Sequence, residues 1–322
     1  MSIYLVKPWW KYYRNGMIKE AIKPYSILAQ EFDLLVDEPL KNHTSFKIGG
    51  TADLLALPED KIQLKNLYKK AWQLDIPITL FGGGTNLLIS DRGIRGLVII
   101  TKQLKSKIKL IETDSDIKTI IADSGERLSK ICRFAINNTL TGLEFAAGIP
   151  GTIGGAIIMN AGTKSGEMST IIKSIEVLNF NTLEIETIEK NFLNFSYRHL
   201  NLSGIIVSAA ITLKKGNQEH IEQIFKHNLN SKNSTQPLSF ASAGCFFKNP
   251  AVGKSAGELI DKAGLKGMSV NDAAVSEKHG NFIINKRNAT CQDILLLKQK
   301  IQKIVFEKFR IKLETEVRIE GE

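Results

Sequence analysis

The chain has 322 residues and a formal net charge of +10, and 43% of its residues are hydrophobic and 24% charged. These values exclude a disordered chain and predict two or three domains. The lysines are spread along the chain, and no apolar run approaches the roughly 20 residues that span a bilayer, so neither a nucleic-acid partner nor membrane insertion is expected.

Residues 1–24 are expected to form an N-terminal extension. Within them, residues 7–14 mix tryptophan and tyrosine with lysine and arginine, a composition that would also suit contact with a membrane interface. Met17 is an alternative start of the chain.

The first half of the chain alternates predicted helices and strands. Apolar residues at helical spacing predict a helix over residues 59–74, and a buried strand over 76–81 follows it. Further β-rich runs cover residues 97–101 and 117–122. A second helix begins near Leu128, and its apolar stripe includes Cys132, which is therefore a predicted core residue.

In the second half, strands are predicted near residues 175–180 and 205–213, and the polar stretch 214–236 begins with a helix. Capping boxes at Ser255 and Thr290 predict two more helix starts, the second of which carries Cys291 as an inert residue. A final strand is predicted near residues 313–319. This mixed order indicates α+β or α/β layers, with a break near residue 214.

The three cysteines are Cys132, Cys245 and Cys291. None forms a C-x-x-C pair, and no histidine stands near them at ligand spacing, so neither a metal site nor a disulfide framework is expected. Scattered thiols suit a reducing compartment, and a cytoplasmic location is therefore expected.

Two glycine-rich segments carry the first functional signal. One is residues 82–86, Gly-Gly-Gly-Thr-Asn, directly after a predicted strand, and the other is residues 148–156. Glycine lets main-chain N–H groups approach a phosphate, so two such loops can clasp one pyrophosphate from both sides. The first lacks the last glycine of G-x-G-x-x-G, which excludes the Rossmann motif. Each loop alone is equally compatible with a tight turn beside packed strands.

The ordered set of motifs is more specific than either loop. It comprises residues 43–50, 80–88, 142–156, 197–198, 242–250, 256–261, 277–279 and 313–318. In this order the motifs closely resemble the UDP-N-acetylenolpyruvoylglucosamine reductase (MurB) family of peptidoglycan synthesis. The resemblance runs from about residue 25 to residue 320. The short interval between Arg198 and Cys245 is similar to the shorter, second type of this family.

The resemblance implies an α+β fold with a vanillyl-alcohol-oxidase-type FAD-binding module in two subdomains and a C-terminal α/β substrate domain. The FAD-binding domain would cover residues 25–214, with its core at about 43–214. The substrate-binding domain would cover residues 215–322, including a terminal strand that carries Glu316. The implied activity is NADPH-dependent, FAD-mediated reduction of UDP-N-acetylglucosamine enolpyruvate to UDP-N-acetylmuramate.

The resemblance also assigns roles to three candidate catalytic residues. Arg198 would hold the substrate carboxylate and stabilise the enolate that hydride addition creates, since a guanidinium keeps its charge. Glu316 would polarise that carboxylate, with Glu314 as its nearest competitor on the same expected strand. Cys245 stands where the family usually has a serine proton donor, and it keeps a protic side chain.

The remaining implied contacts concern the cofactor and the substrate. Tyr197 and Asn249 match substrate-binding positions, and His279 is expected to be structural. The residues that match the non-covalent FAD site are Gly82, Gly83, Gly84, Thr85, Asn86, Gly148, Ile149, Gly151, Thr152 and Gly155. Lys47 and the pair Asn271-Asp272 depart from the common residues of the family.

Two other functions stay open at this point. One is a flavin oxidase of the same fold acting on another substrate. The other is a catalytically inactive nucleotide-binding protein. The Arg198, Cys245 and Glu316 set argues against both, and a monomer is the expected state.

Overall fold

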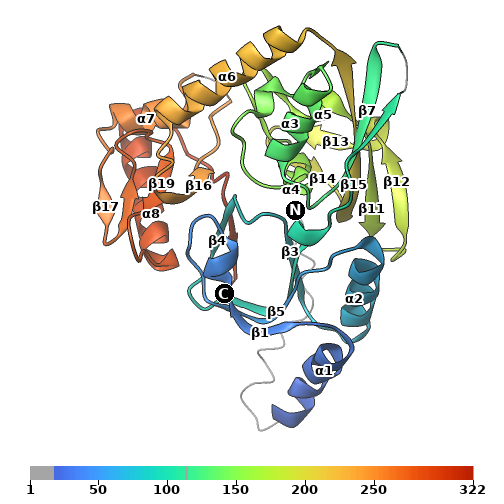
Figure 1. Ribbon diagram of the computed structural model, residues 1–322. Helices are drawn as coiled ribbons and strands as arrows, with labels where there is room; N and C mark the ends of the chain where they lie inside the picture. The colour runs from blue at the N-terminus through green and yellow to red at the C-terminus, as the bar shows by residue number, and fades with distance from the viewer. Residues whose placement is uncertain (1–17, 113–114, 252, 322) are drawn as a thin grey trace.

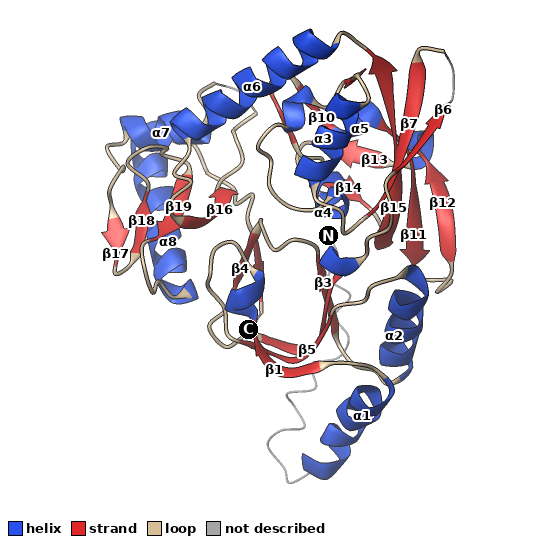
Figure 2. Ribbon diagram, in the orientation of Figure 1, coloured by secondary structure: helices blue, strands red, loops and turns tan. Residues whose placement is uncertain are grey.

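The computed structural model describes residues 18–112, 115–251 and 253–321, and it has three lobes, each built on its own sheet (Figure 1). Of the N-terminal extension expected over residues 1–24, residues 1–17 lie outside the described residues, and residues 18–24 are the first part of a helix. Two of the lobes come from the first two thirds of the chain, and the third is formed by the last third (Figures 1 and 2).

The first lobe contains a four-stranded sheet of order β1-β2-β5-β3. Its strands are β1 (Leu35–Pro39), β2 (Thr51–Ala56), β3 (Ile78–Phe81) and β5 (Ile94–Ile100), and β4 (Leu87–Ile89) lies between β3 and β5 in the chain. Helices α1 (Ile18–Glu31) and α2 (Lys61–Gln73) accompany the sheet, with the 3₁₀ turns η2 (Leu40–His43) and η3 (Thr101–Gln103). The Asp60 side chain caps α2 by accepting from the N–H groups of Ile62 and Gln63. The predicted helix 59–74 and strand 76–81 are thereby confirmed within two residues.

The second lobe contains a six-stranded sheet with the order β12-β11-β15-β7-β6 and with β8 beside β15. Its strands are β6 (Lys109–Glu112), β7 (Ile117–Asp123), β8 (Leu140–Thr141), β11 (Ile172–Asn179), β12 (Ile185–Glu189) and β15 (Gly204–Lys215). Helices α3 (Leu128–Asn137), α4 (Ile153–Ile158) and α5 (Met168–Ile171) and the 3₁₀ turns η4 (Glu144–Ala146) and η5 (Lys190–Phe192) belong to it. Two small hairpins complete it: β9 (Gly162–Thr163) with β10 (Gly166–Glu167), and β13 (Asn194–Ser196) with β14 (His199–Asn201).

Helix α6 (Gln218–Thr235) runs along the top of the molecule in Figure 1 from the second lobe to the third. The third lobe has an antiparallel sheet of order β16-β19-β18-β17. Its elements are β16 (Ala241–Cys245), α7 (Ala256–Lys262), β17 (Ser269–Val270), β18 (Ala273–Val275), β19 (Phe282–Asn285) and α8 (Cys291–Phe309). The Thr290 capping box is confirmed at the start of α8. At α7 only half of the predicted box forms, because the Glu258 side chain pairs with Lys262 instead.

The last strand of the chain returns to the first lobe. It is β20 (Arg318–Glu320), which pairs with β4 in parallel. The strand predicted near residues 313–319 is therefore wrong in its bounds, and Glu316 lies before the strand rather than on it. Residues 313–317 cross between lobes instead: the N–H group of Glu316 donates to Phe246 O at 2.9 Å, and that of Arg318 to Asn86 O at 3.1 Å. This crossing brings a residue from the end of the chain to the first glycine loop.

Candidate active site

The two glycine loops predicted from the sequence lie against each other. The first connects β3 to β4, and the second leads into α4. A methyl group added at Gly83 would lie 3.2 Å from Cα of Gly151, and one at Gly82 would lie 2.5 Å from Oγ1 of Thr152. Gly84 has φ +66°, and a methyl group there would lie 2.0 Å from the carbonyl oxygen of His43. Side chains are therefore excluded from the place where the loops meet.

This cradle fits a pyrophosphate group. Main-chain N–H groups are accessible where side chains are excluded, and such groups bind phosphate oxygens. In addition, the hydroxyl of Ser124 is buried beside Gly154 and has no hydrogen-bond partner among the described residues. The ten residues expected to bind FAD all belong to these two loops.

The first loop is also tied to the segments that carry the candidate catalytic residues. The Ser45 N–H group donates to Gly84 O at 3.0 Å, and the Ser45 hydroxyl donates to Ser242 O at 2.7 Å on β16. The Asn86 amide donates to the carbonyl oxygen of Glu316 at 3.1 Å. A shift of the loop would therefore move β16 and Glu316 as well.

Arg198 occupies the two-residue turn that joins β13 and β14, with Ser196 paired to His199. Its φ is +56°, a conformation that a side chain with a Cβ rarely adopts, and such strain is typical of functional positions. The guanidinium donates to Gly162 O at 2.9 Å and to Asn160 O at 3.4 Å. Its Nε lies 3.4 Å from Oε1 of Glu316, so the structure brings these two predicted residues together.

Glu316 is the less exposed of the two glutamates considered from the sequence. Its side chain is 19% exposed, whereas that of Glu314 is 78% exposed and lies 4.0 Å from Lys248 Nζ. Burial raises the pKa of Glu316, although Arg198 and Lys248 oppose the shift. A carboxyl group with a raised pKa can donate a hydrogen bond as the neutral acid.

Cys245 ends β16 at an irregularity in the sheet. Ser242 pairs with Ile284 and Cys245 with Phe282, so three steps on β16 oppose two on β19, and Gly244 has φ +81°. A bulge of this kind changes the direction of the side chain that follows it. Burial raises the pKa of the Cys245 thiol to about 12; Glu316 acts in the same direction, and Arg198 and Lys232 oppose it. The thiol is therefore protonated at neutral pH.

The two predicted substrate contacts differ in their surroundings. Tyr197 is 48% exposed, and its ring centroid lies 5.1 Å from Cζ of Arg198. The Asn249 side chain accepts a hydrogen bond from the Ala256 N–H group at 3.0 Å, at the start of α7. Substrate binding by either residue stays a prediction.

Sequence reasoning missed two polar residues of the site. Asn281 is buried; its amide donates to Phe247 O at 2.8 Å, and its Oδ1 accepts from the Phe247 N–H group at 2.9 Å, which holds the chain next to Cys245. Lys232 of α6 packs its stem against Gly148, and burial lowers its pKa to about 8. Neither residue belongs to a motif with a distinctive pattern.

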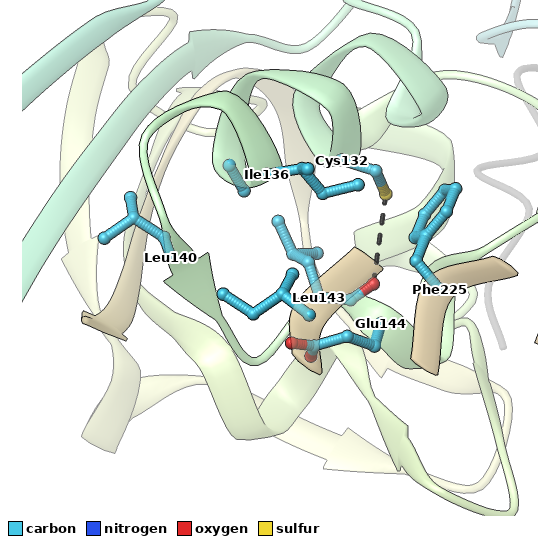
Figure 3. Close-up of a pocket in the computed structure, with 8 residues that line it drawn as sticks. Cys132, Ile136, Leu140, Leu143, Glu144 and Phe225 are labelled. Carbon is cyan, nitrogen blue, oxygen red and sulfur yellow. Dashed lines mark hydrogen bonds between the residues drawn. The ribbon is translucent and has the colours of Figure 1, made fainter. Parts of the chain in front are cut away.

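The other two cysteines are buried. Cys132 is 1% exposed, as predicted for a core residue, and its thiol donates to Leu143 O at 3.9 Å (Figure 3). The apolar space around it has no room for a water molecule. Cys291 is buried at the first residue of α8. His279 accepts from the Asn281 N–H group at 3.1 Å and packs edge-on against Phe282, contacts in keeping with its expected structural role.

Over the described ranges, no cluster of histidine, cysteine and carboxylate side chains could hold a metal ion. No described helix is long and apolar enough to cross a membrane.

Comparison with known proteins gives first the class and then the family. Residues 52–187 match the description "FAD binding domain", and residues 236–320 match "UDP-N-acetylenolpyruvoylglucosamine reductase, C-terminal domain". The protein is therefore a flavoprotein with the expected FAD-binding module. It belongs to the UDP-N-acetylenolpyruvoylglucosamine reductase family, as the following relatives show.

The chain is 45% identical to the UDP-N-acetylenolpyruvoylglucosamine reductase of Caldanaerobacter subterraneus, over 92% of this chain and 96% of that one. It is 44% identical to that of Clostridium kluyveri, over 94% and 97%. Among solved structures, the MurB of Thermus caldophilus superposes with a TM-score of 0.76 at 33% identity, covering 89% of this chain and all of that one. The expected family, fold class and flavin-dependent enzyme class are confirmed.

Proposed function

We propose that this protein reduces UDP-N-acetylglucosamine enolpyruvate to UDP-N-acetylmuramate, with NADPH as the electron donor and non-covalent FAD as the cofactor. The observation that supports this most directly is the convergence of Arg198, Glu316 and the Cys245 segment beside the two glycine loops. The reaction would belong to peptidoglycan precursor synthesis in the cytoplasm. When bound, FAD supplies hydride transfer, and the protein supplies position and electrostatics.

Arg198 is the group that stabilises negative charge. Addition of hydride to the terminal carbon of the enolpyruvyl group pushes an electron pair toward its carboxylate. A guanidinium that stays charged and is held in place stabilises that enolate in the transition state. Both hydrogen bonds that the Arg198 guanidinium donates to the protein go to neutral main-chain carbonyls, and the carboxyl group beside it is that of Glu316, which would share the substrate carboxylate with it.

Glu316 would help to hold the same carboxylate. Because burial raises its pKa, the side chain is poised to donate a hydrogen bond as the neutral acid when the anionic substrate displaces remaining water. Its main chain is fixed between Phe246 O and the Asn86 amide, so the side chain keeps its place relative to the first glycine loop.

Cys245 would complete the reaction as the proton donor. Once hydride has formed a C–H bond at the terminal carbon, the enolate carbon beside the carboxylate takes the thiol proton, and the thiolate recovers a proton from water. A thiol with a pKa near 12 remains protonated until this step. Both hydrogens of the product are then accounted for.

The domain division expected from the sequence is part of the proposal. Residues 25–214 would bind FAD and residues 215–322 would bind the UDP-sugar, with Tyr197 and Asn249 as substrate contacts. The ten glycine-loop residues would hold the pyrophosphate of FAD without a covalent bond. Denaturation should therefore release intact FAD from the yellow protein, and flavin that stays with the precipitated chain would contradict this.

The decisive test is NADPH consumption with and without UDP-N-acetylglucosamine enolpyruvate, with mass analysis of the product. We expect consumption to depend on the sugar and to yield a product that carries two additional hydrogens. Oxygen uptake at the same rate without the sugar would indicate the oxidase alternative. Purified protein without flavin would indicate the inactive nucleotide-binding alternative.

A further inference from the structure

Asn160 is a buried polar residue that neither the motifs nor the proposed mechanism uses. It lies two positions after the last residue of α4, is 1% exposed and has φ +39°. Its amide donates to Oε1 of Glu167 and to Ser196 O, both at 3.0 Å, and its Oδ1 accepts from the Ser169 N–H group at 2.9 Å. Every polar atom of this side chain is therefore used.

The orientation of the Asn160 amide is fixed by its neighbours. A carboxylate and a carbonyl can only accept, and a main-chain N–H group can only donate, so the nitrogen must face Glu167 and Ser196. The Ser169 hydroxyl also donates to Oε1 of Glu167, at 2.6 Å, which holds that carboxylate in place. The cluster of Asn160, Glu167 and Ser169 is thus a closed hydrogen-bond network.

This network reaches Arg198 by two routes. Ser196, whose carbonyl binds the Asn160 amide, is the last residue of β13 before the turn that carries Arg198. The carbonyl of Asn160 itself accepts from the Arg198 guanidinium, as does that of Gly162 two residues later. One side chain therefore fixes the backbone that leads to Arg198, and its own main chain holds the guanidinium.

Helix α4 connects the network to the second glycine loop. The helix begins after Thr152, whose side chain accepts from the Gly155 N–H group, and the N–H group of Asn160 donates to Ile157 O at 2.9 Å. Gly155, the last residue expected to bind FAD, lies in this helix, five positions before Asn160 (160 − 155). Because the turns of a helix are hydrogen-bonded to one another, a displacement at one end of this short helix also moves the other end.

We propose that Asn160 is a positioning residue that, together with Glu167 and Ser169, aims the Arg198 guanidinium at the carboxylate of the substrate. The proposal rests on the function proposed for Arg198. Asn160 does not touch the reacting atoms, and its contribution passes through Arg198 alone. Misplacement of a catalytic group by about 1 Å can cost about 10²-fold in rate.

The test uses Asn160→Asp in the full-length protein. Aspartate tolerates positive φ nearly as well as asparagine, so the substitution removes only the two donors and sets a carboxylate against Glu167. We expect flavin reoxidation by the enolpyruvyl sugar to slow by about 10- to 100-fold, with flavin reduction by NADPH changed less than about threefold. Glu167→Ala should act in the same direction if Asn160→Asp does not fold, and Glu167→Gln, which keeps an acceptor oxygen, should recover most of the rate.

Asn285→Asp is the matched control. Asn285 is also buried, at the end of β19; its amide donates to Phe46 O at 3.2 Å, and its Oδ1 accepts from two main-chain N–H groups, none of them in a residue that binds Arg198. In the Asn285→Asp variant, the rates of both half-reactions should stay within about threefold of those of the parent. In an Arg198→Ala background, Asn160→Asp should slow flavin reoxidation by less than about a further twofold, because the effects of coupled residues are not additive. A full additional loss there would overturn the positioning role.

A second readout does not depend on the substrate. Arg198 opposes the rise in the pKa of Cys245, so a displaced guanidinium should slow alkylation of that thiol at a given pH. Asn160→Asp and Arg198→Ala should both slow labelling of Cys245 severalfold, with Cys132 and Cys291 unchanged. Faster labelling of all three cysteines would show general loosening and overturn the proposal. If the parent flavin were not reoxidised by the sugar, the proposed function would fail while this measurement still decided the role of Asn160.

Discussion

The turn that carries Arg198 and the bulge that carries Cys245 solve opposite electrostatic problems with similar backbone devices. Both use a left-handed residue, Arg198 itself with φ +56° and Gly244 with φ +81°. The arginine is charged because a guanidinium cannot be deprotonated in proteins, and two main-chain carbonyls hold it in place. The thiol is desolvated beside Glu316, so it keeps its proton. The comparison shows that Arg198 owes its charge to its residue type and its position to main-chain carbonyls, whereas burial strengthens the hold of the Cys245 thiol on its proton.

The two regions also differ in how they are held. The two carbonyls that accept hydrogen bonds from Arg198 lie within the second lobe, less than 40 positions away in the chain, and only its ion pair with Glu316 comes from the end of the chain. The Cys245 segment depends on partners from the end of the chain, Asn281 and Glu316. A substitution that loosens the third lobe should therefore displace Cys245 more than Arg198.

The largest effect on the rate is expected from substitution of Cys245, the proposed proton donor. Cys245→Ala removes the proton donor and should slow flavin reoxidation by the sugar by about 10²- to 10⁴-fold. Cys245→Ser keeps a protic group and should retain substantial activity. Stopped-flow traces of both variants measure this directly. Parent-like turnover by Cys245→Ala would assign the proton to another group.

A slightly smaller effect on the rate is expected from substitution of Arg198, the cation beside the substrate carboxylate. Arg198→Ala should slow reoxidation by about 10²- to 10³-fold, as removal of a stabilising donor typically does. Glu316→Ala should act on the same half-reaction. Reduction of the flavin by NADPH in the two variants is the internal control and should change little. Equal slowing of both half-reactions would remove the distinction between catalysis and general damage.

Asn281 tests how the bulge is held. Asn281→Ala would leave the N–H and C=O groups of buried Phe247 without partners, and each such loss costs about 1–3 kcal/mol. We expect a lower free energy of unfolding, measured by denaturant titration, together with slower reoxidation. A variant with the parent's stability would show that water replaces the amide and that the segment is held by other contacts.

Lys232 gives the smallest effect and a pH signature. Its pKa is lowered to about 8, so the ammonium is charged below that pH and loses its charge as the pH rises through it. If the cation assists the anionic substrate, the reoxidation rate should fall by up to about tenfold above pH 8. Lys232→Met should be slower and should lack this decline. Cys245 cannot produce it, because its thiol titrates near 12. If the rate of Lys232→Met still declined above pH 8, the decline would come from another titratable group.

The features that could be predicted from the sequence are those encoded by residues next to one another. The glycine loops, the α2 and α3 helices and the Thr290 cap depend on local spacing, and the structure contains all of them. The pairing of Arg198 with Glu316 was available only through the family resemblance, since the two residues are 118 positions apart in the chain (316 − 198). No local pattern brings residues so distant together.

The features that were missed depend on main-chain partners far along the chain. Asn160 and Asn281 are ordinary asparagines in the sequence, and their importance comes from the carbonyl and N–H groups that folding presents to them. The final strand was placed too early because residues 313–317 alternate in a strand-like way. In the fold, they cross between lobes with only an isolated bridge between Phe247 and Thr315.

The most direct test of the account is a single turnover without oxygen. The flavin is first reduced, excess reductant is removed, and the enzyme is mixed with UDP-N-acetylglucosamine enolpyruvate while flavin absorbance is followed. The parent protein should recover oxidised flavin and form an equal amount of UDP-N-acetylmuramate, and Arg198→Ala and Cys245→Ala should recover it far more slowly. Flavin that stays reduced in the parent until oxygen is admitted would contradict the proposed function.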